Sequence, residues 1–600
     1  MIAASAGFTQ LDWAVLVLYF VAITAFGLWV ARKIRSSGGY FLGDRQLPWW
    51  VMVGQSFGTG TNAENPVAQT GATCNLGFAT IWYQWKNMLI TPFYWLMSPW
   101  YRRSDRTTIG EMIEDRYGRK LAGLYTLFAI AFFVFNQGAM LKGAGKIISV
   151  ATGGEIISPN GVVISMTFAF ILYSFFGGLV ASAYTDFVQG FLIIGLSFLL
   201  IPTGLHAVGG FTGMRASLPP DFFNLYSDVS GLDGFTIAML AINGFVGITA
   251  QPHILTMNAT GRTERAGRIG QTYGSMVKRF CTIGWALTGL IVAAMVIQRG
   301  VQLPDAEHAF GYACLELLGP GMVGLLVACV LAANMSTCSN FMVNTGALFT
   351  RNFYAHYINP SATDRQLLWM GRLSGLGLTI LGVAFALTVD QVLDAFLFTE
   401  TIAALMGIMF LGGILWKRAN RHGALAATVA SFAVYYALGF LLTCRAPGHT
   451  GPSATLTEAY QRVAAARHEG TLASFLRSGE VRLVYKWRPA PYGWATLAGF
   501  GALILVSLAT RQEDPERLER FFDSLRRSSD PDASRSGGPR PLAADRGQDL
   551  ILLDLPGWLS ADRWHGFLRR YREDVVGFAI GWIAVGGLVL FAWGLMQLGR

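Results

Sequence analysis

Two clusters of small and polar residues interrupt apolar stretches of this 600-residue chain, and both could coordinate a cation. The first is Gly58-Thr59-Gly60-Thr61-Asn62-Ala63-Glu64-Asn65-Pro66, midway through the apolar stretch 49–74. Glycine loosens a helix, and Pro66 lacks the N–H that would bond the carbonyl of Asn62. Hydrocarbon offers no partner to a bare carbonyl, so irregular backbone at that depth must line a cavity or bind something.

The second cluster is Ala332-Ala333-Asn334-Met335-Ser336-Thr337-Cys338-Ser339-Asn340, inside the apolar stretch 322–349. Small hard cations prefer oxygen ligands, which broken membrane helices supply from unwound carbonyls. The alternative for Ser336 and Thr337 is close helix packing, with hydroxyls bonded back to their own helix. Glu64 resists that explanation, because a carboxylate at membrane depth costs about 3 kcal/mol or more. The two clusters together predict an ion and solute site at mid-membrane.

Composition places the chain among polytopic membrane proteins. It is 53% hydrophobic and 14% charged, against roughly 25% charged residues in soluble domains. Its six cysteines show no metal-binding spacing, and Cys74, Cys314 and Cys444 could fall on one side of the membrane without defining a bridge. The net charge of +10 lies mostly in short loops, which favours topology charges over nucleic-acid binding. No cleavable signal peptide is evident, so the first apolar helix is expected to be retained.

The apolar pattern predicts about 14 membrane spans. Lys and Arg crowd one set of short loops, at 32–45, 102–120, 262–279, 351–365 and 417–421, and we count Lys278 and Arg279 among these loop charges. The alternate short loops hold only Arg215 and Arg299. The basic loops are therefore expected in the cytoplasm of a multi-pass cell-membrane protein, with both termini outside. The predicted spans are 11–31, 48–74, 78–100, 121–148, 160–178, 181–205, 235–257, 277–298, 321–350, 368–389, 393–416, 423–443, 493–510 and 574–597.

Two longer polar stretches remain between spans. Residues 445–492 are expected outside, and residues 511–573 in the cytoplasm. The composition of 528–546, rich in Ser, Pro, Gly, Asp and Arg, predicts disorder. The flanking segments 515–522 and 564–568 have the pattern of short amphipathic helices on the membrane surface, with a solvated linker as the equal alternative.

Six motifs in order resemble the sodium/solute symporter family, which holds the sodium/glucose and sodium/proline cotransporters. The similarity runs from about residue 10 to 443, with a weaker echo at 514–522. One such motif is weak, whereas six in the same order are specific. They are YFLGDRQLPWW at 40–50, TIGEMIEDRYG at 108–118, the segment 177–189 that ends in YTDFVQ, QPHI at 251–254, ANMST at 333–337 and LGGILWKRAN at 411–420.

The resemblance implies an all-α fold of the LeuT type, in which ten core helices form two five-helix inverted repeats between extra flanking helices. The first helix of each repeat is broken, which agrees with Gly58–Thr61 in one and with Gly244, Gly247 and Pro252 in the other. The implied organisation is an extra helix and loop (1–47), the first repeat (48–205), an external loop (206–234), the second repeat (235–416), extra helices with an external loop (417–510), a cytoplasmic loop (511–573) and a last span (574–597).

Carried over residue by residue, the family's sodium site maps to the carbonyls of Gly58, Thr61 and Ala333 and to the hydroxyls of Ser336 and Thr337. Asp186 matches an aspartate thought to guide sodium, with a cytoplasmic helix cap as the alternative.

The resemblance also implies a solute site. Glu64 and Asn65 resemble an Ala-Glu-Gln motif of sugar-transporting members, and Gln84 lies in a segment resembling their Tyr-Glu-Trp motif. Asn87 lies one turn on, and Gln251 belongs to the proline-type motif. These groups could read hydroxyls by paired hydrogen bonds.

This chain also departs from the sugar members. Their aromatic gate is missing in 242–248, and Phe396 falls near their tenth-helix glutamine. Lys86, Asp394 and Glu400 stand in or near core helices and could contact solute, pair or snorkel, and for Lys86, Lys142 and Lys146 the interface is favoured. His253 is expected to be a satisfied polar residue rather than a ligand or proton carrier.

The resulting expectation is a sodium-coupled symporter that imports a small polar organic solute, with no cofactor beyond the coupling ion. A sugar-like solute is slightly favoured over an amino acid or a carboxylate. Sodium is favoured over protons because the ion site offers neutral oxygens. The alternative is a transporter-like sensor that signals through 511–573. An enzyme is disfavoured because no nucleophile–base or metal constellation is present. The identity of the solute, the sodium stoichiometry and the oligomeric state stay open.

Overall fold

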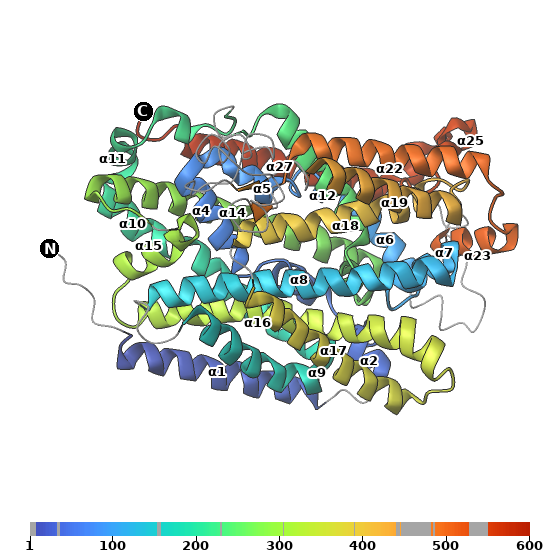
Figure 1. Cartoon of the computed structure of the whole chain (residues 1–600), viewed down its shortest axis with the longest axis horizontal. Coiled ribbons are helices and arrows are strands. Elements are labelled where there is room, and N and C mark those ends of the chain that lie inside the picture. Colours follow the sequence, from blue (N-terminus) through green and yellow to red (C-terminus); the bar gives the residue numbers. More distant parts are fainter. Residues whose placement is uncertain are drawn as a thin grey trace, which may run out of the picture.

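The structure is a computed structural model that describes residues 8–32, 36–152, 158–227, 231–303, 305–388, 391–439, 444–445, 482–483, 487–526 and 550–600. Most of the chain forms long helices that lie side by side along one direction (Figure 1). The long helices are α1 (Gln10–Ala31), α8 (Arg119–Ala151), α9 (Pro159–Phe198), α12 (Gly234–Ala250), α14 (Glu264–Arg299), α16 (Met322–Leu348), α17 (Asp364–Ala386), α18 (Val392–Leu415), α19 (Arg421–Gly439), α22 (Pro489–Ala509) and α27 (Arg572–Leu595).

Shorter helices fill the bundle and cover its ends. They are α2 (Ser37–Leu42), α3 (Trp49–Thr59), α4 (Glu64–Leu76), α5 (Trp82–Trp85), α6 (Thr91–Arg103), α7 (Ile109–Tyr117), α10 (Leu200–Val208), α11 (Gly210–Ser217), α13 (Ile254–Ala259), α15 (Ala309–Leu317), α23 (Pro515–Arg526), α25 (Ala561–Trp564) and α26 (Phe567–Arg570). One two-stranded antiparallel pairing joins β1 (Cys444–Arg445) and β2 (Arg482–Leu483). A π-helical segment, Phe349–Ile358, extends α16.

Both predicted helix breaks are confirmed. The first is the non-helical stretch between Thr59, where α3 ends, and Glu64, where α4 begins; Pro66 falls in the first turn of α4, where its missing N–H costs nothing. In the second, Gln251 is extended because it precedes Pro252, and this ends α12 before α13 begins.

Gly244 and Gly247 do not loosen the second broken helix as predicted, because both lie inside the continuous helix α12. They permit close packing instead. A Cβ added at Gly244 would overlap the Asn87 side chain, and one at Gly247 would come within 3.3 Å of the Ala404 nitrogen. Small residues at these positions therefore let α12 approach its neighbours.

Every predicted span falls on helical structure, although the number of spans stays a prediction. Among the described residues, nine helices are long and apolar enough to cross a membrane. The spans 48–74, 78–100 and 235–257 fall on pairs or groups of shorter helices, which a length criterion misses. The spans 160–178 and 181–205 share the helix α9, which kinks at Gly178, where φ is +52°.

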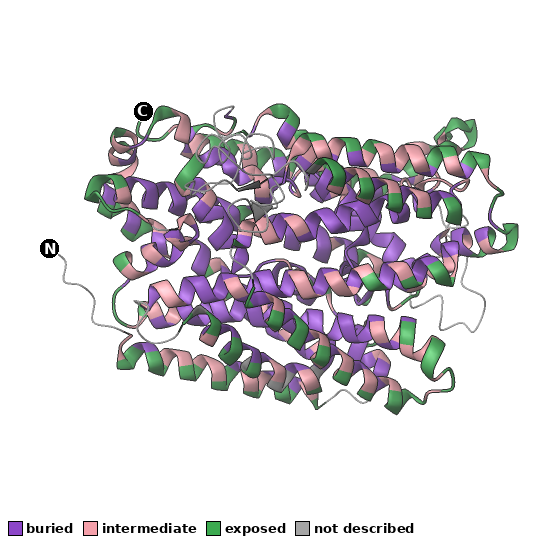
Figure 2. Cartoon of the chain, viewed as in Figure 1, coloured by how far each residue is buried: buried purple, intermediate pink, exposed green. Residues whose placement is uncertain are grey.

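The bundle has an inner and an outer layer of helices. The most apolar windows of α14, α16 and α18 are 83–89% buried, whereas those of α1, α17, α22 and α27 are only 17–28% buried. Figure 2 shows exposed residues along the outer helices. The exposed residues there include Leu18, Leu505 and Ile583, so the outer layer presents an apolar surface suited to lipid.

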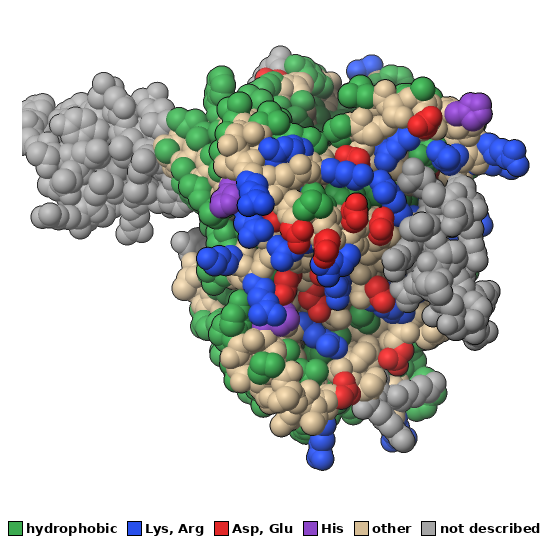
Figure 3. Space-filling view, turned by 90° about the vertical axis from the view of Figure 1, so that its right-hand side faces the viewer, with side chains coloured by type: hydrophobic (Ala, Val, Ile, Leu, Met, Phe, Trp, Pro, Cys, Tyr) green, Lys and Arg blue, Asp and Glu red, His purple; other side chains and the backbone are tan. Residues whose placement is uncertain are grey.

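One end of the bundle carries many charged side chains (Figure 3). In Figure 1, α10, α11, α15 and the C-terminus lie at the left end, where α1 also begins. The right end carries α7, α23 and α25, and Figure 3 shows Lys, Arg, Asp and Glu side chains gathered on it. The described chain begins and ends at the same end of the bundle, which agrees with the even number of spans that we predicted.

At the charged end, α23 lies on the protein rather than on the membrane surface. Its apolar residues Leu518, Phe521, Phe522 and Leu525 are buried, and its carbonyl at Leu525 accepts a hydrogen bond from Arg103 at 3.3 Å. This corrects the membrane-surface expectation for 515–522. Trp564 and Leu568 are exposed, so the expectation for 564–568 stays a prediction. The predicted disorder at 528–546 lies outside the described residues.

Candidate functional site

The first helix break is held in place by the second polar cluster. The N–H of Ala63 donates to Asn334 Oδ1 at 2.8 Å, and Asn334 Nδ2 donates to the carbonyl of Met140 at 2.7 Å. Asn334 thus links the α3–α4 break to both α16 and α8. An amide suits this position because it can accept and donate at the same time.

Three carbonyl oxygens surround the Thr337 hydroxyl at this junction. Thr337 Oγ1 lies 3.3 Å from the Gly58 oxygen, 3.1 Å from the Thr59 oxygen and 3.4 Å from the Ala333 oxygen. The Ser336 hydroxyl is fully buried and, within the described residues, makes no hydrogen bond. The structure therefore brings the predicted oxygens of Gly58, Ala333 and Thr337 together and adds that of Thr59.

Asp186 lies beside the same junction. Its Oδ2 accepts a hydrogen bond from Thr59 Oγ1 at 3.2 Å, and its Oδ1 has no hydrogen-bond partner among the residues described. A Cβ added to Gly58 would lie 2.9 Å from both Ser336 Oγ and Asp186 Cβ. Asp186 is completely buried, so it is not an exposed helix cap. A buried carboxylate beside several oxygens is suited to a cation.

Thr61, the remaining predicted sodium ligand, lies in the same break. Its side chain is buried and its Oγ1 has no hydrogen-bond partner in the described part of the chain. Its N–H donates to the carbonyl of Gly58 at 3.2 Å. The position of Thr61 in the break agrees with the predicted ligand set, but no contact joins its carbonyl to the other oxygens.

A polar cavity adjoins the junction, and the α3–α4 break forms part of its wall. The empty space within it, including open space at its mouth, is about 630 Å³. Thr59, Gly60 and Asn62 line it on the side of the break, and α14 contributes Gln271, Ser275, Lys278 and Arg279. Because Thr59 belongs to both the cavity and the oxygen cluster, a change at one site reaches the other directly.

Three of the five predicted solute residues line this cavity, namely Glu64, Asn87 and Gln251. Asn65 does not; its Oδ1 accepts the N–H of Asn62 at 3.2 Å and so helps to shape the break. Gln84 is buried but does not line the cavity either. The positions of Asn65 and Gln84 therefore do not support the prediction that these two residues bind the solute by paired hydrogen bonds.

Lys86 and Lys146 correct our preference for the membrane interface, because both are buried and paired. Lys86 Nζ donates to Asn243 Oδ1 at 2.9 Å and lies 3.3 Å from the Glu400 carboxylate. Gln251 Nε2 donates to the other Glu400 oxygen at 2.8 Å. Lys146 lies 2.8 Å from Asp305 and 2.6 Å from Glu307. Lys142 is only partly buried.

The prediction that Lys278 and Arg279 are loop charges is wrong. Helix α14 begins at Glu264, capped by the Thr263 side chain, so both residues lie roughly 20 Å along it at 1.5 Å per residue. Lys278 Nζ donates to the carbonyl of Gly60 in the break. The Thr263–Glu264 pair is a helix-start signal, and using it would have placed both cations inside the bundle.

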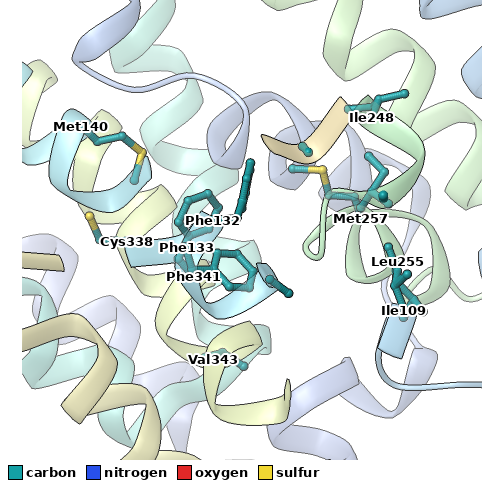
Figure 4. Packing of buried hydrophobic residues seen from close by; sticks show 14 of the residues in the cluster. Ile109, Phe132, Phe133, Met140, Ile248, Leu255, Met257, Cys338, Phe341 and Val343 are labelled. Atoms are coloured by element: carbon teal, nitrogen blue, oxygen red, sulfur yellow. The ribbon is translucent and has the colours of Figure 1, made fainter. Parts of the chain in front are cut away.

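Aromatic side chains line one side of the cavity. Phe341 belongs to its wall and packs against Phe133 with ring centroids 4.7 Å apart. His253 stacks near Phe132 and Phe341, at 6.0 and 5.2 Å, and its Nδ1 has no hydrogen-bond partner within the described residues. The expectation of a satisfied histidine is therefore wrong for Nδ1. Figure 4 shows Phe132, Phe133 and Phe341 together between Met140 and Met257.

The five cysteines whose side chains the structure describes, Cys74, Cys281, Cys314, Cys329 and Cys338, are free thiols. A bridge between Cys74 and Cys314 is thereby excluded in this structure. The side chain of Cys444 lies outside the described part of the chain.

Comparisons with known proteins agree with this geometry. The chain is 25% identical over 479 residues to a sodium/glucose cotransporter of Vibrio parahaemolyticus, which covers 72% of this chain and 86% of the relative. It is 28% identical over 345 residues to a high-affinity proline transporter of Bacillus subtilis, covering 55% and 70%. Sodium/glucose cotransporter 1 of Oryctolagus cuniculus is 25% identical over 472 residues, covering 70% and 71%.

A solved structure shares the fold. A Na⁺-coupled sialic acid symporter in a substrate-bound outward-open state superposes with a TM-score of 0.65 at 16% identity, covering 84% of this chain and 99% of that one. The relatives are transporters, so the prediction that the chain is not an enzyme is confirmed. Residues 40–430 match the family model as well, and the chain is therefore a member of the sodium:solute symporter family, a multi-pass membrane protein of sodium-coupled transport.

Proposed function

We propose that this protein is a symporter that uses sodium moving inward to import a small polar organic solute. The observation that carries the proposal is the position of Thr59. Its carbonyl lies 3.1 Å from Thr337 Oγ1, its hydroxyl donates to Asp186, and the residue forms part of the cavity lining. An ion among these oxygens and a solute in the cavity therefore share one piece of wall.

Coupling follows from this shared wall. A cation bound to the oxygens of Gly58, Thr59, Ala333, Ser336 and Thr337 ties the end of α3 to α16, and Thr61 is proposed as a further ligand. This fixes the orientation of Thr59, Gly60 and Asn62, which the solute meets in the cavity. Ordering the site before the solute arrives raises solute affinity, and linkage requires the solute to raise sodium affinity equally. One charge crossing 100 mV releases about 2.3 kcal/mol to drive uptake.

The architecture proposed for this function is the LeuT type, with inverted repeats at 48–205 and 235–416 and extra helices on both sides. The two helix breaks support it, since each falls in the first helix of a proposed repeat. We further propose that the N-terminus faces outward across the cell membrane, which the gathering of charge at the opposite end of the bundle supports (Figure 3).

Among solutes, sugar-like molecules lead, with amino acids and carboxylates as alternatives. Glu64, Asn87 and Gln251 offer the acceptors and donors that hydroxyl groups require. Relatives named for glucose and for proline support a small organic solute without choosing between these classes.

The test begins with purified protein, because the solute is unidentified. A thermal-shift screen against sugars, amino acids, carboxylates and vitamins, in sodium and in potassium, identifies binders. Uptake of each binder is then measured in proteoliposomes with and without an inward sodium gradient. We expect accumulation only with the gradient, and accumulation indifferent to sodium would refute the proposal.

A further inference from the structure

The central cavity carries an unequal set of buried charges. Three cations, Lys86, Lys278 and Arg279, meet two carboxylates, Glu64 and Glu400. Lys86 lies immediately behind the wall through its contact with Glu400, and the other four line the cavity. The four charged residues of the lining balance, and Lys86 behind the wall gives these five described side chains one formal positive charge in excess. Buried charge of this kind is costly unless a partner arrives to compensate it.

Arg279 and Lys278 both lack an ion-pair partner among the described residues, but Lys278 donates to the Gly60 carbonyl. Glu400 is already engaged by Lys86 on one oxygen and by Gln251 on the other. Arg279 forms no ion pair with any residue that the structure describes, and its Nε and Nη1 atoms have no hydrogen-bond partner there. Its side chain is only 3% exposed, and the Tyr94 hydroxyl is its neutral neighbour. Its unpaired N–H groups belong to a side chain of the cavity wall.

A carboxylate is the group that these donors fit. The guanidinium presents its N–H groups in a planar fork that binds two carboxylate oxygens at once. Glu64 offers the complementary feature, because its buried Oε2 accepts no hydrogen bond from the described residues and is available to a hydroxyl donor. Sodium brings its own charge, but Asp186 beside the oxygen cluster compensates that ion separately.

We propose that the solute is a small hydroxylated monocarboxylate, held by its carboxylate on Arg279 and by a hydroxyl group on Glu64. This inference rests on the proposed function and narrows its solute class. A monoanion brings these five side chains together to formal neutrality. A neutral sugar leaves Arg279 uncompensated, and a zwitterionic amino acid leaves the excess positive charge unchanged.

The test compares matched solutes that differ in the carboxylate. Melting temperatures of the purified full-length protein are measured in sodium with D-gluconate, D-glucuronate, glycerate, D-glucose and L-proline. We expect at least one of the hydroxylated acids to give a saturable rise in melting temperature. Glucose and proline should not bind with comparable affinity. Glucose or proline binding as tightly as the acids would overturn the inference, as would the absence of any shift with the three acids.

Variants of Arg279 test whether this residue binds the carboxylate of the solute. Arg279→Gln should weaken binding of the acid about ten- to a hundred-fold, the loss expected for a hydrogen bond to a charged group, and Arg279→Lys should retain part of it. Arg299→Gln, an exposed position at the end of the same helix, is the matched control. Unchanged acid affinity in Arg279→Gln would overturn the inference.

Sodium titration without solute separates this inference from the proposed function. Arg279→Gln should keep the sodium-dependent rise in melting temperature, which shows that the variant folds and binds the ion. Sodium-driven uptake of a neutral solute would refute the proposal of a carboxylate solute and leave the symporter proposal standing. Loss of sodium dependence in the wild type would refute the symporter proposal itself.

Discussion

The hydroxyls of Ser336 and Thr337 offer the sharpest test of the sodium site. The changes are Ser336→Ala, which removes one oxygen, and Thr337→Val, which replaces the hydroxyl by a methyl group of similar volume. Thr337 Oγ1 lies 3.1–3.4 Å from three carbonyl oxygens, and Ser336 Oγ is buried without a hydrogen bond to any described residue. Each change therefore removes one hydroxyl oxygen from the predicted ligand set.

The expected loss appears when sodium binds. A contact between a hydroxyl oxygen and a charge is worth roughly 1.5–3 kcal/mol, and each 1.4 kcal/mol is about a factor of ten in affinity. Each variant should therefore bind sodium about ten- to a hundred-fold more weakly. Solute affinity at saturating sodium should change much less, because linkage acts through the unfilled ion site.

The assay is a sodium titration of the melting temperature, with potassium keeping the ionic strength constant. Ser339→Ala is the matched control, since it also removes a buried hydroxyl without a described partner from α16 and lies outside the predicted ligands. The site assignment is refuted if Ser336→Ala and Thr337→Val both keep the sodium midpoint of the wild type, as the control Ser339→Ala is expected to do.

Three further changes test the surrounding structure. Asp186→Asn should raise the sodium midpoint roughly tenfold or more, because the carboxylate attracts the ion at low dielectric; an unchanged midpoint in the same titration would remove Asp186 from the pathway. Lys86→Met should destabilise the protein by about 3–5 kcal/mol by leaving Glu400 without its cation, and adding Glu400→Gln should restore most of the melting temperature; equal stability of the single and double variants would contradict the buried pair. Burial raises the pKa of the Glu513 carboxyl, but hydrogen bonds from Arg421 outweigh this and hold that pKa below its ordinary value of 4.5. The charged Glu513 therefore stabilises the docked α23 above pH 4.5, and this contribution is lost as the pH falls through the lowered pKa. Protease protection of α23 should accordingly fall in acid and be weaker in Glu513→Gln at pH 7, whereas protection independent of pH and of this change would refute the contact.

The sequence by itself determined the class of the protein and the places where its helices break. Gly58 and Gly60 mark the first break, Pro66 marks the first turn of the helix that follows it, and Pro252 marks the second break, because Gly and Pro restrict or free the backbone locally. The Ser336–Thr337 pair and Asp186 could be matched to the family motifs because each lies in a short run of sequence that can be compared directly. The ordered series of motifs pointed to the family to which residues 40–430 belong.

Only the tertiary structure decided which polar groups meet. Lys278 and Arg279 follow a run of basic residues, and a local count of charge cannot distinguish a loop from the first turns of a long helix. The Lys86–Glu400–Gln251 network joins Glu400 of α18 to the residues that follow the ends of α5 and α12. Helix α23 packs against parts of the chain some 400 residues earlier, as the contact between Arg103 and Leu525, 422 residues apart, shows. Such contacts depend on how helices pack across the bundle, and the periodicity of one helix carries no information about what its neighbours place opposite it.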